Sequence, residues 1–174
     1  SEEILRFIGI ENCQTATLPA QNGKTANAIR KAKNFIARNY DEIISLPFIS
    51  EKDLQLFGNI TNAVKLLNPI DIEKPYLRSS LIPSILHNIS QCEKHSQYSS
   101  SIFEIATVFY KNSGNFLEHS EICIAKHGHS SIANPIHNQR KYNLFDIKED
   151  IINILTDVFG INGEPLTFQK TNHN

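Results

Sequence analysis

The chain has 174 residues, with 17 basic and 18 acidic side chains and a formal net charge of -1. This length fits one domain with a substantial core, and a hydrophobic content of 40% argues against intrinsic disorder. The balanced charge argues against nucleic-acid binding through bulk electrostatics, and no apolar run approaches the roughly 18 residues of a membrane span. The three scattered cysteines form neither a disulfide framework nor a zinc motif, so we expect a reducing, cytoplasmic location.

The N-terminal segment predicts the end of one module and the start of another. Residues 2–8 have the pattern of a helix, and Gly9 is a typical helix stop. Residues 11–23 are polar and contain Pro19 and Gly23, which favours a linker. We therefore expect residues 1–10 to be the tail of a preceding helical module.

An amphipathic helix is predicted from about Lys24 to Asn39. Its apolar stripe consists of Ile29, Ala32, Ile36 and Tyr40. Basic side chains cover the rest of this helix, and they are compatible with an RNA-facing surface or with an ordinary solvated face. We favour the solvated face, because the apolar stripe alone explains the pattern.

The next segment predicts short elements. Residues 42–48 suggest a strand, with Pro47 near its exit. Ser50 can cap a short helix through Leu56, and residues 64–67 suggest another strand. Further on, Ser80 is predicted to cap a helix that runs to about residue 93.

The strongest strand prediction is residues 102–110, which are rich in β-branched and aromatic side chains and apolar on both faces. Residues 112–115 form a predicted turn, and residues 121–126 pair naturally as the next antiparallel strand. Together these elements predict a mixed α+β domain, an antiparallel sheet with flanking helices.

The C-terminal third predicts an irregular excursion followed by a helix. Residues 127–142 are polar, and Asp146 is expected to cap a helix, with Glu149 reaching back to it. Gly160 ends that helix, and residues 166–168 suggest a last short strand.

Two groups of residues could carry chemistry. His127, His129 and His137 could ligate a metal, but histidines in a polar loop without acidic neighbours more often lie free at the surface. Glu104 lies inside the most apolar strand, so it needs a partner there. That partner could belong to a functional site or to a structural ion pair.

Five segments, in order along the chain, resemble the beta subunit of bacterial phenylalanine–tRNA ligase. The most specific is NPIDIEKPYLRSSLIPSIL at residues 68–86, which is similar to the family's Asn-Pro and Arg-x-Ser-Leu-x-Pro-x-Leu signature. The others are EEILRFIGIEN at residues 2–12, YDEIISLPF at 40–48, FEIATVF at 103–109 and NLFDIKEDI at 143–151.

The resemblance implies a class II aminoacyl-tRNA synthetase-like module over residues 24–174, incomplete at its C-terminal end. In this family the alpha subunit activates phenylalanine with ATP, and the beta module has a related fold without that activity. The resemblance also implies an assembly of two alpha and two beta chains, which attaches phenylalanine to its tRNA.

The residues at the end of the main strand agree with an inactive module. A working class II site needs an Arg, and usually a downstream Glu, where this sequence has Tyr110 and Asn112. Lys111 is a cation, but it is expected to point to the opposite face of the strand.

The resemblance also nominates site residues. Arg78 belongs to the signature, and it could contact the partner subunit, clamp a carboxylate such as Glu104, or simply flank a helix. Glu2 and Glu3 match two acidic residues of the family's Mg²⁺ site, whose upstream Asp is absent from this sequence.

Two hypotheses follow. The first is a scaffold that binds the alpha subunit through a large exposed apolar surface. The second is a class II-like relic that keeps affinity for a nucleotide or amino acid, with a regulatory role. The relic hypothesis predicts a concave polar pocket beside Phe109.

Overall fold

The computed structural model describes residues 2–12, 24–57, 60–130 and 140–161. Residues 13–23 of the predicted linker (11–23) and the predicted strand over residues 166–168 lie outside them, while residues 11 and 12 belong to a 3₁₀ turn. The described helices are α1 (Glu2–Ile8), α2 (Lys24–Ile36), α3 (Glu51–Phe57), α4 (Ile82–Lys94) and α5 (Leu144–Asn153). Short 3₁₀ turns cover Ile10–Asn12 and Ile60–Asn62, and a π-helical turn over Ile154–Val158 extends α5.

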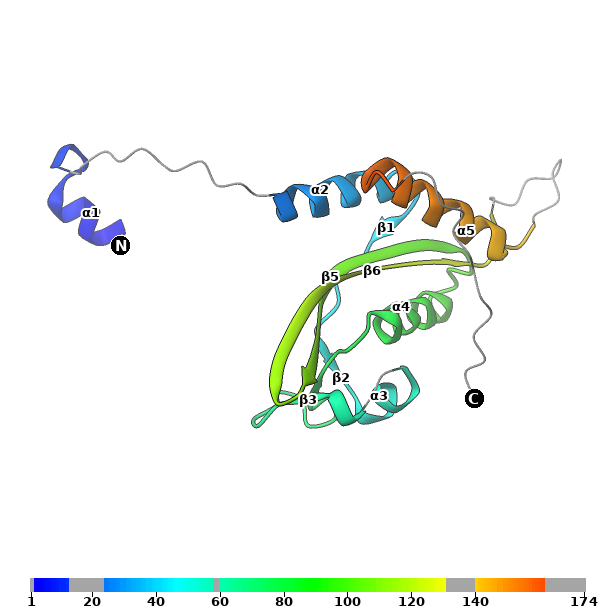
Figure 1. Cartoon of the computed structure of the whole chain (residues 1–174), viewed down its shortest axis with the longest axis horizontal. Coiled ribbons are helices and arrows are strands. Elements are labelled where there is room, and N and C mark those ends of the chain that lie inside the picture. Colours follow the sequence, from blue (N-terminus) through cyan, green and yellow to red (C-terminus); the bar gives the residue numbers. More distant parts are fainter. Residues whose placement is uncertain (1, 13–23, 58–59, 131–139, 162–174) are drawn as a thin grey trace.

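The described strands form two three-stranded sheets (Figure 1). The larger sheet has the order β1-β5-β6, from β1 (Asp41–Glu42), β5 (Ser100–Asn112) and β6 (Asn115–His127). The smaller sheet has the order β2-β4-β3, from β2 (Phe48–Ile49), β3 (Val64–Lys65) and β4 (Tyr76–Leu77). All pairs are antiparallel except β1 with β5, so the mixed α+β class with mainly antiparallel strands is confirmed.

A long hairpin forms the centre of the fold. β5 and β6 pair without interruption from Ser100 opposite His127 to Asn112 opposite Asn115. Ser113 and Gly114 make the turn with φ angles of 49° and 86°. Two left-handed residues in a row match the right-handed twist of the flanking strands, which explains the Ser-Gly pair. The predicted turn is confirmed, and both strands are longer than predicted.

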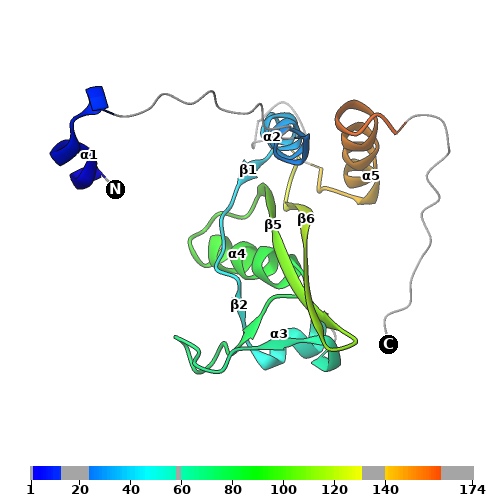
Figure 2. The same ribbon diagram turned by 60° about the vertical axis from the view of Figure 1, so that its left-hand side comes forward.

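Helices cover the two faces of this hairpin. Figures 1 and 2 show α2 and α5 on one side and α4 on the other. Phe103 of β5 is fully buried against Ile36, Tyr40 and Ile154 from the α2 and α5 side. A smaller core of Ile49, Leu54 and Tyr76 joins α3 to the second sheet. The predicted apolar stripe of α2 faces the core, because Ala32, Ile36 and Tyr40 are all buried.

The predicted strand over residues 42–48 is wrong. Only its two ends pair with neighbouring strands: β1 lies parallel to β5, and β2 pairs with β4. Between them residues 43–47 form an irregular connector between the two sheets. The ladder cannot continue through it, because Pro47 has no N–H and the Ser45 N–H is bonded to the Glu104 carboxylate.

Two predicted helix caps are also wrong. Asn143, rather than Asp146, caps α5: its side chain accepts from the Phe145 N–H, and Asp146 accepts from the Asn143 N–H. The capping box therefore starts three residues earlier than predicted. The N-cap residue of α4 is Leu81 rather than Ser80, and Leu81 makes no side-chain cap bond; the Ser80 hydroxyl, one position earlier, accepts from the Ile82 N–H over 3.3 Å and donates to Glu121. The predicted cap at Ser50 is confirmed by the Asp53 N–H, 3.1 Å from its Oγ.

Among the helices that the structure describes, none has both the length and the apolar character to cross a membrane.

Candidate functional site

A buried ion pair lies where the two sheets meet. Arg78, just after β4, places Nη1 3.0 Å from Oε1 of Glu104 in β5. The two side chains are only 5% and 3% exposed. The structure therefore brings together the two residues that the sequence singled out separately, although 26 positions separate them in the chain.

Ser45 of the connector completes this cluster. Its N–H donates to Glu104 Oε1 over 3.1 Å, and its Oγ lies 2.8 and 2.7 Å from the two carboxylate oxygens. The same Oγ accepts from Arg78 Nη1 over 2.8 Å, while Arg78 Nε donates to the Thr107 carbonyl. A buried ion pair is tolerated when such bonds satisfy its remaining donors and acceptors.

The backbone around the ion pair is tied in the same way. The Arg78 N–H donates to the Pro47 carbonyl, and the Arg78 carbonyl accepts from the Phe109 N–H, each over 2.9 Å. The Ile43 N–H donates to the Phe103 carbonyl, also over 2.9 Å. The connector is thus tied to β5 through Ile43 and Ser45 and to Arg78 through Pro47. Reasoning from sequence missed Ser45, although a lone serine between Ile44 and Leu46 was a signal of an inward-facing polar residue.

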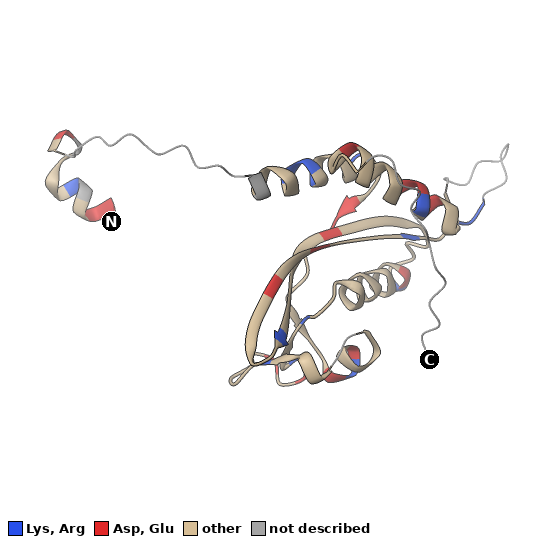
Figure 3. Ribbon diagram, in the orientation of Figure 1, with Lys and Arg blue, Asp and Glu red and all other residues tan. Residues whose placement is uncertain are grey.

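Several segments around this region carry exposed apolar side chains. Ile44 is 91% exposed and Leu46 74%. The loop between β3 and β4 and the outer face of α4 add further exposed aliphatic residues: Leu67, Ile70, Ile72, Ile82 and Leu86. Residues 43–50 carry no charge and α4 carries charge only at its C-terminal end, whereas the β3–β4 loop carries Asp71, Glu73 and Lys74 (Figure 3).

An open groove of about 580 Å³ connects these segments. Leu46, Phe57 and Leu86 line it together with polar residues that include Asp53, Glu73, Lys74 and His87. The groove therefore brings two of the exposed aliphatic residues, Leu46 of the connector and Leu86 of α4, into one neighbourhood, and Ile44 directly precedes its lining residue Ser45. Phe109 is not among its lining residues, so this groove is not the pocket that the relic hypothesis predicts.

The end of the hairpin holds aromatic contacts at Tyr110, the position where the resemblance to class II synthetases led us to expect an Arg in an active site. The Tyr110 ring lies edge-on to the ring of His119, with 5.6 Å between their centroids. Lys111 places Nζ 5.8 Å from the Phe116 ring centre. Since alternate residues of a strand face opposite sides, Lys111 is on the other face from Tyr110, as the sequence suggested.

The predicted metal ligands do not form a centre in the described residues. Glu2 pairs with Arg6 over 2.7 Å on the exposed surface of α1, and Glu3 is exposed beside it. His127 places Nε2 3.0 Å from Glu93, and His137 lies outside the described residues. No three His, Cys, Asp or Glu side chains gather in the described part of the chain. Two adjacent carboxylates can hold Mg²⁺ only when water or other oxygen ligands complete its coordination.

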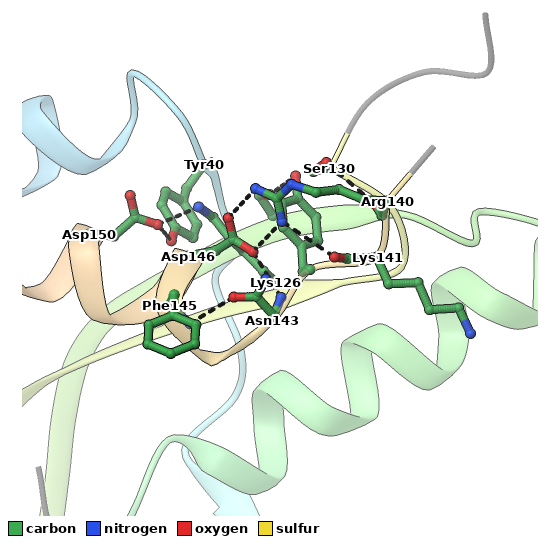
Figure 4. Close-up of polar contacts among 11 residues, drawn as sticks. Tyr40, Lys126, Ser130, Arg140, Lys141, Asn143, Phe145, Asp146 and Asp150 are labelled. Atoms are coloured by element: carbon green, nitrogen blue, oxygen red, sulfur yellow. Dashed lines mark hydrogen bonds and ion pairs between the residues drawn. The ribbon is translucent and has the colours of Figure 1, made fainter. Parts of the chain in front are cut away.

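A separate polar network attaches α5 to the hairpin (Figure 4). Lys126 of β6 forms an ion pair with Asp150 of α5, and the Tyr40 hydroxyl donates to the same carboxylate. The Lys126 ammonium also lies 5.3 Å from the ring centres of both Tyr40 and Tyr142. Burial, assisted by the hydrogen bond to Asp150, raises the pKa of the Tyr40 hydroxyl well above its ordinary value.

Two other groups near this end of the hairpin have shifted pKa values. Arg140 donates two hydrogen bonds of 2.7 and 2.6 Å to Asp146, which holds the pKa of that carboxyl well below its usual range. Burial raises the pKa of the Cys123 thiol to about 11, with smaller contributions from Glu121 and Glu104. Cys123 is therefore a protonated, unreactive thiol at neutral pH.

Comparison with known proteins decides the family. The sequence profile described as "Phenylalanyl tRNA synthetase beta chain CLM domain" matches residues 12–174. The chain belongs to this family. It is 27% identical over 160 residues to the "Phenylalanine--tRNA ligase beta subunit" of Rickettsia prowazekii (strain Madrid E), and the match covers 89% of this chain and 19% of that protein.

Other comparisons agree on family and fold. The beta subunit of Cutibacterium acnes (strain DSM 16379 / KPA171202) is 32% identical over 118 residues, covering 62% of this chain and 14% of that protein. The chain thus spans about a fifth or less of the curated relatives that it matches. Among solved structures, a pyrrolysyl tRNA synthetase from Desulfitobacterium hafniense superposes with a TM-score of 0.63 at 17% identity, covering 98% of this chain and 54% of that one.

A second structural neighbour is an "ATP phosphoribosyltransferase regulatory subunit/histidyl-tRNA synthetase" from Bacillus halodurans C. Its TM-score is 0.59 at 13% identity, covering 84% of this chain and 36% of that one. These likenesses show that the CLM domain of the phenylalanyl-tRNA synthetase beta chain has the fold of class II synthetase catalytic-like domains. The Arg78–Glu104 pair and the Tyr110–His119 contact therefore lie in a synthetase-like frame.

Proposed function

We propose that this CLM domain is a non-catalytic scaffold that binds the alpha subunit of phenylalanine–tRNA ligase. The assembled enzyme has two alpha and two beta chains in the cytoplasm. It attaches phenylalanine to its tRNA, with ATP consumed at the alpha subunit. The scaffold comprises residues 24–174, with residues 1–10 as the tail of a preceding helical module.

The observation that carries this proposal is the exposed apolar surface beside the groove. Ile44, Leu46 and Leu86 are large apolar side chains that are exposed to water in this chain, and burying them against a partner would lower the free energy of the complex. Uncharged surfaces with clustered aliphatic residues are typical of the centre of a protein–protein interface. The same surface would be a poor nucleic-acid site, since its central segment, residues 43–50, offers no cation to a phosphate.

The contacts at the end of the hairpin support the non-catalytic role. In the place of a phosphate-binding Arg, the ring of Tyr110 packs against His119. Neither side chain offers the fixed cationic fork with which Arg holds a nucleotide phosphate. Arg78 and Glu104 have a structural role within the scaffold, because each is buried and satisfied by the other and by Ser45.

We propose that Mg²⁺ binds to the full-length beta subunit at a site that includes Glu2 and Glu3. Glu2 and Glu3 would supply two of its carboxylates at the end of the preceding module, and further ligands would have to come from residues that the structure does not describe. Isothermal titration with Mg²⁺, comparing the beta subunit with its Glu2→Gln/Glu3→Gln variant, tests this. Equal affinity of the two proteins would contradict the assignment.

The scaffold is tested by size-exclusion chromatography with light scattering on the chain mixed with the alpha subunit from the same organism. We expect co-elution at a defined ratio. The matched variants are Ile44→Ser/Leu46→Ser, which makes the proposed interface polar, and Lys31→Ser on α2, which changes an exposed charge on the other side of the hairpin from α4. Loss of binding by both variants, or by neither, would contradict the placement of the interface.

The lack of catalysis is tested by phenylalanine-dependent ATP–pyrophosphate exchange. We expect no exchange with the chain alone and normal exchange when the alpha subunit is present with its full partner. Exchange by the purified chain, free of alpha subunit by mass spectrometry, would refute the non-catalytic role.

A further inference from the structure

The connector between β1 and β2 presents its side chains alternately inwards and outwards. Ser45 points in and is bonded to Glu104 and Arg78, whereas its neighbours Ile44 and Leu46 are largely exposed. Apart from these bonds, the connector has few means of holding its shape. It belongs to neither sheet, and its backbone is tied only at Ile43 and Pro47.

We propose that Ser45, Glu104 and Arg78 are positioning residues for the alpha-binding surface. The Glu104 carboxylate holds the middle of the connector through the Ser45 N–H and hydroxyl, and Arg78 holds the carboxylate. As a result, the side chains of Ile44 and Leu46 already have a fixed spacing and orientation in the domain before it binds the alpha subunit. This inference rests on the proposed function, and it assigns a role in binding to groups that touch no partner.

The physical reason is preorganisation. A connector that had to order itself on binding would lose conformational entropy at that moment, and the affinity would fall by the corresponding factor. The aliphatic contacts of Ile44 and Leu46 would not hold the connector in one conformation by themselves, because such contacts are not directional. A buried carboxylate is suited to it, because its bonds to an N–H and a hydroxyl have strict geometry and are strong in a dry environment.

The position of the cluster explains why an ion pair is used. The cluster lies at the junction of the two sheets, since Arg78 follows β4 of one sheet and Glu104 belongs to β5 of the other. Holding the connector there also fixes one sheet relative to the other. An apolar replacement could fill the same space, yet it would leave the Ser45 N–H without a partner.

The test uses Ser45→Ala, with Ser45→Thr as the conservative rescue and Ser80→Ala as the matched control. Ser80 also donates to a carboxylate, that of Glu121 over 3.2 Å, but it does not touch the connector. Binding of the alpha subunit is measured by calorimetry, Tm by circular dichroism, and exchange of the amide hydrogens of residues 43–47 by mass spectrometry.

We expect Ser45→Ala to weaken binding about tenfold, because the freed connector must then be ordered on binding and fixing about one residue costs roughly that factor. It should also speed hydrogen exchange in residues 43–47, and the lost bonds to Glu104 and Arg78 should lower Tm. Ser45→Thr, which retains the hydroxyl, and Ser80→Ala should both bind like the wild type. A merely structural serine would lower Tm and leave the affinity of the folded fraction unchanged.

Two results would overturn the inference. One is an unchanged affinity of folded Ser45→Ala, and the other is an equal loss in Ser80→Ala. If Ser45→Ala does not fold, Arg78→Met/Glu104→Leu replaces it, with the same expected loss of affinity and the same contrary outcome. Failure of the proposed function is a different result, in which the wild-type chain does not bind the alpha subunit although residues 43–47 are protected from exchange.

Discussion

Lys126 offers a sharp test of how α5 is attached to the hairpin. Its ammonium forms an ion pair with Asp150 and lies over the rings of Tyr40 and Tyr142. Both charged side chains are mostly buried, with exposed fractions of 12% and 18%. The substitution Lys126→Met keeps most of the aliphatic stem and removes only the charge.

The magnitude follows from these contacts. A hydrogen bond to a charged group contributes about 1.5–3 kcal/mol, and each cation–π contact about 0.5–1 kcal/mol when partly exposed. Asp150 keeps the hydrogen bond from Tyr40, so it is not left without a partner. We therefore expect Lys126→Met to lower the free energy of unfolding by about 2.5–5 kcal/mol. For a chain of this length, each kcal/mol corresponds to about 2–4 °C in Tm.

The assay is urea unfolding followed by circular dichroism, with Lys52→Met as the control. Lys52 is an exposed residue of α3, so its replacement should change stability by less than about 0.5 kcal/mol. Hydrogen exchange should show the largest loss of protection in α5, because the network joins that helix to β6. A change in Lys126→Met no greater than that of the control would refute the reasoning and show that solvent already screens this pair.

Three further predictions concern the core and two titrating groups. Phe103→Ala empties a fully buried site between β5 and α2, so we expect a loss of about 3–5 kcal/mol in urea unfolding, and a loss below about 1 kcal/mol would contradict the core assignment. Because the folded pKa of Cys123 is raised from 9.0 to about 11, its protonated thiol stabilises the fold below pH 9 and loses that effect as the pH rises through 11. Cys123→Ala should therefore lose less stability than the wild type over this window, and equal slopes would refute the shift. Asp146 has a lowered pKa, so its contribution is present above the unfolded value of 3.8 and is lost as the pH falls below it. Asp146→Asn should flatten the acid side of the stability profile, and an unchanged profile would contradict this.

Local pattern was sufficient for the long elements. The apolar stripe at Ala32, Ile36 and Tyr40 predicted α2, and the β-branched run around Phe103 predicted β5. Both predictions succeeded because a 3.6-residue or 2-residue period records directly which face is buried. Local pattern failed over residues 42–48, because the Ser45 N–H bonds to a carboxylate 59 positions away rather than to a neighbouring strand.

The candidate site was predictable in its members and not in its geometry. Glu104 had to find a partner because a charge inside an apolar strand is costly, and Arg78 stood in the most specific motif. Their contact depends on how β4 approaches β5, which no spacing in the sequence specifies. The caps show the same limit: Asp146 serves as the third residue of a box begun by Asn143, and Ser80 donates to Glu121.

By itself, the sequence determined the types of the long elements, the mixed α+β class and, through five ordered segments, the family to which the chain is similar. These properties rest on contacts between near neighbours and on residue types, both of which are written along the chain. Only the tertiary structure decided that Ser45 and Arg78 converge on Glu104, that Lys126 lies between two tyrosine rings, and that Ile44 and Leu46 remain outside. Those contacts join residues far apart in sequence, and their geometry exists only once the sheets and helices have packed together.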